Sequence, residues 1–190
     1  MIKLGRITAV FIVILFSTVL IFAQEDDLTL IIKSKYFSLY GPQDLDVYPL
    51  LTNLYFDYFL QPETILKKDT QDSDEILANL LDALYLEVSD ILDIHIYSYH
   101  GKIRILPDQD SVGRAFKKIF SIDFDERSFY IYDNNTIYIS LSDLNIGMLG
   151  HEFAHAIISN YFVVPPPAKV QEVLSGYVEY TLRKSTGTLP

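Results

Sequence analysis

Residues 148–158 read Met-Leu-Gly-His-Glu-Phe-Ala-His-Ala-Ile-Ile, and the fold expected for the chain is organised around them. Their apolar residues recur at roughly helical spacing, which predicts a buried helix. On such a helix His151 and His155, four residues apart, project from one face, where two imidazoles can bind one Zn²⁺. Glu152 lies about 100° further around the helix, where its carboxylate can reach a water bound to that metal.

A chance match to the His-Glu-x-x-His pattern is the alternative to a metal site. The chain has only 4 histidines, and composition alone would produce the pattern in roughly one of a few hundred such sequences. The flanking residues are apolar, and histidine and glutamate are costly to bury unless they are paired or bind a metal. The pattern therefore favours a metal site.

The composition limits the class of protein. The chain has 190 residues, of which 49% are hydrophobic, enough for one domain with a real core, which we expect over residues 28–190. Its net charge of −10 argues against binding to nucleic acid or to anionic membrane surfaces, because both select for basic patches. The absence of cysteine excludes disulfides and thiolate ligands, so any zinc must be held by histidine and carboxylate.

The N-terminal segment bears on localisation. Lys3 and Arg6 precede an uncharged apolar run over residues 7–23, the pattern of a secretory signal peptide that would end at Ala23. Ile21 stands where a small residue is usual, and the run is nearly long enough to span a bilayer, so an uncleaved membrane anchor is the alternative. We expect an exported protein, with a membrane partner only if residues 1–23 are retained.

The rest of the pattern predicts an α+β domain with strands before and after a group of helices. The metal helix is expected to begin at a Ser142 or Asp143 cap. His95 and His100 have no partner at ligand spacing and are left out of the site. The predicted strands are 28–40, 102–106, 128–132 and 136–141, and a turn at 133–135 joins the last two. The predicted helices are 44–60, 77–91, 112–119, the metal helix and a helix that ends near 184–187.

A catalytic zinc site usually has three protein ligands, and no histidine follows His155. After the prolines at 165–167, the last helix carries Glu172 and, two turns further along the same face, Glu179. We expect Glu172 to be the third ligand because it lies early in the helix, where the proline turn could fold it back towards the metal. Glu179 is the alternative, and Glu172 could also be an acid favoured by the helix dipole.

The pattern at 151–155 and the helix that follows the proline turn resemble the gluzincin zinc metallopeptidases, most closely the group called peptidase MA-like. In the second motif Glu172 and Tyr177 match, Ser175 stands where a small alanine is expected, and Val173 replaces a glycine. The resemblance implies a zincin-like domain, in which a small mixed β-sheet packs on an active-site helix and a following glutamate-bearing helix.

The resemblance also implies a function. A zinc-dependent metallopeptidase would hold Zn²⁺ with His151, His155 and Glu172 and hydrolyse peptide bonds with zinc-bound water that Glu152 activates. Its partner would be a peptide or unfolded protein, paired in extended form with an edge strand, for which residues 136–141 are the candidate. The alternative is an exported zinc-binding gluzincin-like interaction module that is not catalytic.

The residue that would stabilise the oxyanion is left open. Tyr177, Tyr180 and Tyr138 are candidates, but the chain has 14 tyrosines and most should serve packing. None is therefore assigned, and the sequence makes no prediction of the oligomeric state.

Overall fold

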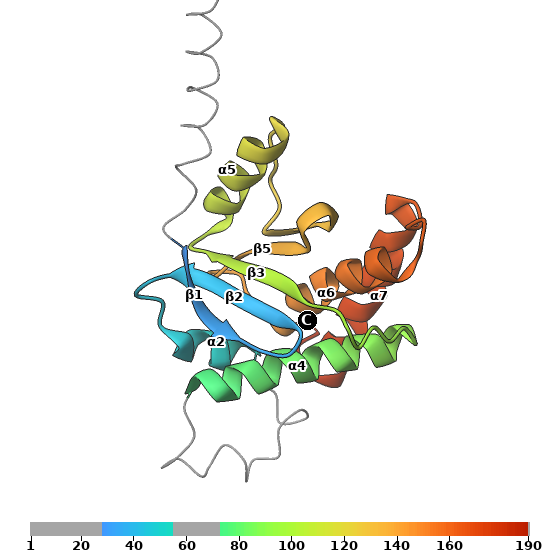
Figure 1. The fold of residues 1–190 in the computed structure, drawn as a ribbon, viewed down its shortest axis with the longest axis horizontal. Coiled ribbons are helices and arrows are strands. Elements are labelled where there is room, and N and C mark those ends of the chain that lie inside the picture. The colour runs from blue at the N-terminus through green and yellow to red at the C-terminus, as the bar shows by residue number, and fades with distance from the viewer. Residues whose placement is uncertain (1–27, 55–72, 190) are drawn as a thin grey trace, which may run out of the picture.

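The computed structural model describes residues 28–54 and 73–189 (Figure 1). The signal peptide or anchor expected over residues 1–23 lies outside this part of the chain, as do residues 55–60 of the helix expected over 44–60. Among the described residues, no helix combines the length and the apolar character needed to cross a membrane.

Strands β1 (Leu28–Lys33), β2 (Phe37–Pro42), β3 (Gly101–Leu106), β4 (Ser128–Ile131) and β5 (Thr136–Ser140) form one sheet. Within the described residues this sheet has five strands in the order β1-β2-β3-β5-β4. The outer pairs β1–β2 and β4–β5 are antiparallel, whereas β2–β3 and β3–β5 are parallel. The mixed character of the expected sheet is thus confirmed.

The described helices are α2 (Val47–Leu54), α4 (Ser73–Leu92), α5 (Gln109–Phe120), α6 (Ile146–Tyr161) and α7 (Ala168–Ser185), with a short 3₁₀ turn, η1 (Tyr132–Asn134), between β4 and β5. The chain is therefore a mixed α/β protein, in broad agreement with the expected class. The long helix, the strand at 102–106, the short helix after it and the hairpin before the metal helix all lie where the pattern predicts them.

The single strand expected over 28–40 is wrong, because the chain turns back after β1 and returns as β2. The turn is held from a distant element: Asp82 on α4 accepts hydrogen bonds from Ser34 Oγ at 2.7 Å and from the backbone N–H groups of Lys35 and Tyr36 at 3.0 Å. A carboxylate supplied across more than 40 residues replaces the glycine or proline that usually marks such a turn.

The expected edge strand over residues 136–141 is also wrong. Strand β5 lies between β3 and β4, and its five residues are all buried. Because β5 pairs in parallel with β3, its hairpin partner β4 takes the outer position of the sheet. At this end of the sheet, the edge strand is therefore β4.

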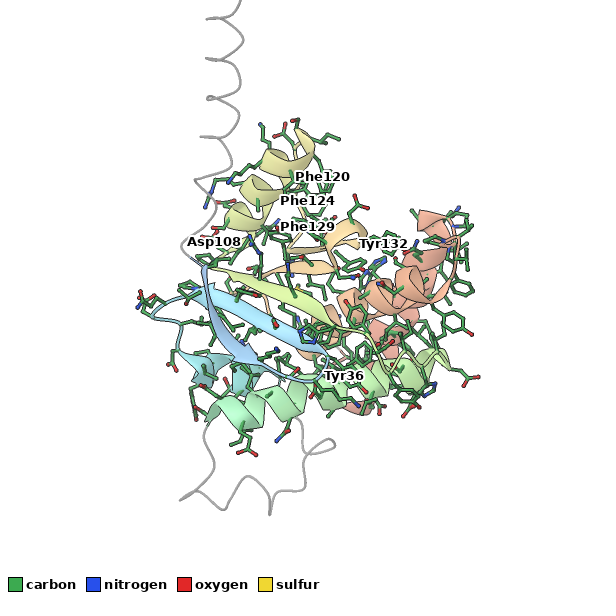
Figure 2. The ribbon with its side chains drawn as sticks, in the orientation of Figure 1. Tyr36, Asp108, Phe120, Phe124, Phe129 and Tyr132 are labelled. Atoms are coloured by element: carbon green, nitrogen blue, oxygen red, sulfur yellow. The ribbon has the colours of Figure 1, made fainter. Side chains whose placement is uncertain are left out.

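Two groups of buried side chains hold the layers together. On one face of the sheet, Phe153 of α6 stacks on Phe37 of β2 with ring centroids 4.2 Å apart, and Tyr85 of α4 packs edge-on against both. The other face carries α5, under which Phe124 and Phe129 pack edge to face (Figure 2). The aromatic packing fixes α6 against the sheet and so fixes the position of the histidines.

Helix α6, which corresponds to the expected metal helix, begins later than the sequence predicts. Asn145, and not Ser142 or Asp143, caps α6, since its side-chain oxygen accepts from the backbone N–H of Met148 at 3.0 Å. Ser142 and Asp143 instead hydrogen-bond with each other and with Ser140 at the end of β5. These contacts tie the last strand to the start of the metal helix.

Close packing of α6 on α7 depends on Gly150. A Cβ atom added at Gly150 would overlap Leu182 Cδ1 and come within 3.7 Å of Val178. Both α7 side chains are fully buried. The glycine therefore lets the two helices that carry the candidate ligands approach each other.

Gly150→Ala is expected to destabilise the fold by about 1–2 kcal/mol, because the cost of overpacking exceeds the helix propensity that alanine gains. Urea unfolding followed by circular dichroism measures the change. Leu182→Ala alone should cost about 2–4 kcal/mol by leaving a cavity. The double variant should cost less than the sum of the two, since the new methyl group fills part of that cavity. Strict additivity would mean that the two side chains do not meet.

Candidate metal centre

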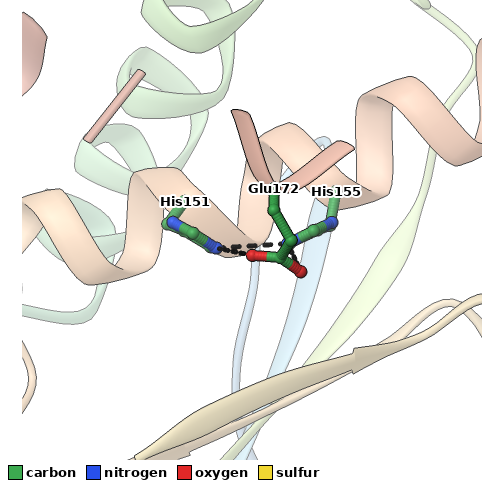
Figure 3. Close-up of side chains that lie close together, drawn as sticks. All are labelled: His151, His155 and Glu172. Carbon is green, nitrogen blue, oxygen red and sulfur yellow. Dashed lines mark hydrogen bonds and ion pairs between the residues drawn. The ribbon is translucent and has the colours of Figure 1, made fainter. Parts of the chain in front are cut away.

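Helices α6 and α7 bring three of the predicted site residues together (Figure 3). The Nε2 atoms of His151 and His155 are 3.1 Å apart. The Glu172 carboxylate lies between them, with Oε2 3.4 Å from His151 Nε2 and Oε1 3.4 Å from His155 Nε2. The two imidazole nitrogens and the carboxylate group therefore form a compact triangle, in which each nitrogen faces a different carboxylate oxygen and one ligand atom from each residue lies within 4.8 Å of the others.

The spacings between these atoms are compatible with zinc. Nitrogen and oxygen ligands about 2.0–2.1 Å from a tetrahedral zinc ion lie about 3.3–3.4 Å from one another. Here the two nitrogens are 3.1 Å apart, and each lies 3.4 Å from the carboxylate oxygen that faces it, Oε2 for His151 and Oε1 for His155. Two neutral imidazoles and one carboxylate are also a donor set that zinc accepts, and three ligands leave one tetrahedral position for water or substrate. The residues present therefore fit the metal that the sequence predicts.

Glu179 occupies a different place from Glu172. Its Oε2 lies 3.4 Å from Nδ1 of His151, the ring nitrogen that points away from the triangle. That distance is long for a hydrogen bond, and Nδ1 has no other partner. Glu179 also faces Arg183, whose Nη1 is 3.5 Å from Oε1. Glu172 thus lies in the candidate ligand group with His151 and His155, and Glu179 lies on the other side of the His151 ring.

His155 also has a partner behind its ring. Its Nδ1 lies 3.5 Å from Oε1 of Gln171, and the same oxygen accepts from Ser159 Oγ at 3.2 Å. The Gln171 amide nitrogen donates to the carbonyl of Pro166 at 2.8 Å, which fixes the side chain. Partners of this kind set the tautomer and orientation of metal-binding histidines. Helix α7 thus carries the candidate ligand Glu172. It also carries a potential acceptor for the second nitrogen of each imidazole, Glu179 for His151 and Gln171 for His155.

Glu179→Gln is expected to weaken zinc binding by about tenfold, because the carboxylate that orients His151 and increases its basicity is lost. Titration with a competing chromophoric chelator measures the affinity. Arg183→Met is the matched control, since it changes the other neighbour of Glu179 and leaves the carboxylate in place. Complete loss of zinc in Glu179→Gln, with zinc retained in Glu172→Ala, would exchange the roles of the two glutamates.

Glu152 follows His151 on α6, lines the same cleft as the candidate ligands and is only 4% exposed. Its Oε1 accepts a hydrogen bond from Ser128 Oγ at 2.7 Å, whereas Oε2 is buried without a hydrogen-bond partner. A buried carboxylate oxygen with no partner is costly and needs an explanation. A group that enters the site and donates to Oε2, such as a reacting water, would supply one.

The carboxylates and imidazoles shift one another's protonation. Burial raises the pKa of Glu152 to about 7, against the opposing hydrogen bond from Ser128. Burial lowers the pKa of His151, but the neighbouring carboxylates, Glu179 foremost, outweigh it and raise the pKa above its ordinary value. The pKa of His155 is lowered by burial and by His151. Contact with His151 lowers the pKa of Glu179.

The three residues and Glu152 face an open cleft of about 1490 Å³. Its walls come from α6, α7 and the edge strand β4, which contributes the residues from Ser128 to Tyr130. Tyr132 of η1 also lines it. Of the tyrosines considered from the sequence, Tyr138 is buried in the sheet, whereas Tyr177 and Tyr180 are exposed and do not line this cleft.

The remaining histidines lie elsewhere, as expected. His95 pairs with Asp90 at 2.8 Å, and His100 contacts Ser38 Oγ at 2.9 Å. The sequence reasoning did not find Ser128 or Gln171, which contact Glu152 and His155. No local pattern marks Ser128, because its contact joins positions 24 residues apart.

No protein-family model, curated protein or solved structure matches the chain. The function must therefore be argued from the motif, the group of candidate ligands and the buried glutamate in the same cleft. Each of these can be tested separately.

Proposed function

We propose that the chain is a zinc metallopeptidase with a zincin-like fold, in which His151, His155 and Glu172 hold the metal. The observation that carries this proposal is the close group of His151, His155 and Glu172, whose ligand atoms lie within 4.8 Å of one another, in the same open cleft as a buried carboxylate. The N-terminal pattern supports export of the protein, with residues 1–23 as signal peptide or anchor.

Zinc bound at this triangle would supply positive charge that makes a water more acidic and a scissile carbonyl more electrophilic. Glu152 accepts the proton of the attacking water on Oε2, the oxygen without a partner in the structure. The same carboxyl then donates the proton to the leaving amine. Ser128 holds the other oxygen, Oε1, and leaves Oε2 to take up the proton.

Strand β4 supports the assignment of a peptide as the substrate. It pairs with β5 on one side and lies at the end of the sheet order, so its other side offers backbone N–H and C=O groups. Residues of β4 also line the cleft in which Glu152 and the histidines lie. An extended peptide added to this edge would gain backbone hydrogen bonds with little sequence selectivity.

A zinc-binding interaction module without catalytic activity is the second candidate. The buried position of Glu152 argues against this second candidate. A module that only binds zinc has no use for a buried carboxylate with one oxygen that lacks a hydrogen-bond partner. The two candidates share the metal site and differ in the chemistry of this one residue.

The test is cleavage of unfolded casein by the purified full chain, in detergent if residues 1–23 are retained. We expect cleavage that a chelator abolishes and added zinc restores. Stoichiometric zinc without cleavage of casein or of a mixed peptide library would favour the interaction module. Absence of bound zinc after refolding with zinc present would overturn both candidates.

A further inference from the structure

Helix α7 has a second apolar face that nothing in the described chain covers. Its inner face, with Ser175, Val178 and Leu182, is fully buried. Its outer face carries an exposed stripe of Val170 (46% exposed), Val173 (67%), Tyr177 (56%) and Tyr180 (51%).

The spacing of this stripe is that of a helix–helix seam. Its four residues are separated by three, four and three positions, the repeat by which the a and d residues of a coiled coil meet a facing helix. The opposite face of α7 already contacts α6. A second helix is therefore the partner that the exposed stripe fits.

In sequence, Gly176 lies between the two valines and the two tyrosines of the stripe. Packing within the described chain does not require a glycine at this position. A Cβ atom at Gly176 would meet nothing within 4 Å, whereas one at Gly147 or Gly150 would run into side chains of α7. A glycine inside a helix costs about 1 kcal/mol relative to alanine. Gly176 lies at the margin of the stripe, about 100° around the helix from Tyr177, where a missing side chain would let the backbone of a second helix approach closely.

We propose that this face binds a second copy of the chain, through an antiparallel pair of α7 helices around a twofold axis beside Gly176. The order of side-chain sizes argues for this occupant, because two valines lie before the glycine and two tyrosines after it. Antiparallel pairing places Val170 opposite Tyr180 and Val173 opposite Tyr177, so that small meets large at all four contacts. Parallel pairing would set tyrosine against tyrosine and leave a gap between the valines.

The pairing leaves the metal site accessible. The residues of the stripe do not line the cleft, and the pairing requires neither zinc nor hydrolysis. Because Glu172 is next to Val173 on α7, the pairing would also stiffen the helix that supplies the third candidate ligand. Each subunit would keep its own cleft.

The absence of cysteine makes cross-linking a clean test. Full chains carrying Val170→Cys and Tyr180→Cys are mixed and treated with a short bismaleimide, in solution or in membranes. The antiparallel pair keeps three of its four contacts and brings the two cysteines together. We expect at least tenfold more cross-linked dimer from the mixture than from either variant alone or from Asp110→Cys, an exposed control on α5.

The outcome decides the arrangement. In a parallel pair the two positions are ten residues, or about 15 Å, apart along the helix, so each variant would instead cross-link alone. That result, or background cross-linking throughout, would overturn the proposal.

Gly176→Leu added to both cysteine variants tests the close approach. Because position 176 has open space in the single chain, the circular dichroism spectrum should be unchanged while cross-linking falls to background. Cross-linking that survives a leucine at this position would contradict a helix seated on the glycine.

Discussion

Zinc binding is expected to weaken by at least about a hundredfold in His155→Ala, because each ligand of a protein zinc site contributes roughly 3 kcal/mol. His155 provides one corner of the triangle, 3.1 Å from His151 Nε2 and 3.4 Å from Glu172 Oε1. Mass spectrometry of the purified protein gives the metal content, and competition with a chromophoric chelator gives the affinity. Glu172→Ala should show a similar loss.

His95→Ala is the matched control for this loss. It removes the same side chain from a site where the partner is Asp90 and the metal triangle is not involved. Its zinc content should equal that of the parent chain. Equal zinc in His155→Ala and the parent would show that the triangle does not bind the metal, whatever its dimensions.

The histidines and Glu172 could be predicted from the sequence because helical periodicity fixes their geometry. A spacing of four residues determines where two side chains point once the helix is given. Glu172 required only that the next helix fold back, which the prolines allow. Periodicity could not decide between Glu172 and Glu179, because both lie on one face of α7. The packing of α7 on α6 places Glu172 at Nε2 and Glu179 at Nδ1 of His151.

The misplaced elements share a physical cause. The turn between β1 and β2 depends on Asp82 from α4, and the edge position of β4 depends on the parallel pairing of β5 with β3. Both are contacts between segments far apart in the chain. Propensity and periodicity describe neighbours in sequence, so they predicted the hairpin before the metal helix correctly but not its place in the sheet.

Glu152→Gln is expected to reduce peptide cleavage by about a hundredfold to ten-thousandfold while zinc binding stays within about threefold. The amide has nearly the shape of the carboxylate, and its oxygen can still accept the hydrogen bond from Ser128 Oγ. It cannot take up a proton from water, so only the chemical step should fail. The measurement is cleavage of a quenched fluorescent peptide, with metal content determined on the same preparation.

Two further variants show whether the loss of peptide cleavage in Glu152→Gln is caused by the missing proton transfer. Glu126→Gln makes the same change at an exposed acid of the same cleft and should leave cleavage unchanged. Ser128→Ala removes the contact that holds Oε1 but leaves a base in place, so its cleavage rate should lie between those of the parent and Glu152→Gln. Full cleavage by Glu152→Gln would assign the base to another residue. Equal losses in all three variants would point to a change in the cleft as a whole, because among the described residues that line it Glu152 is the acid with a carboxylate oxygen buried without a partner.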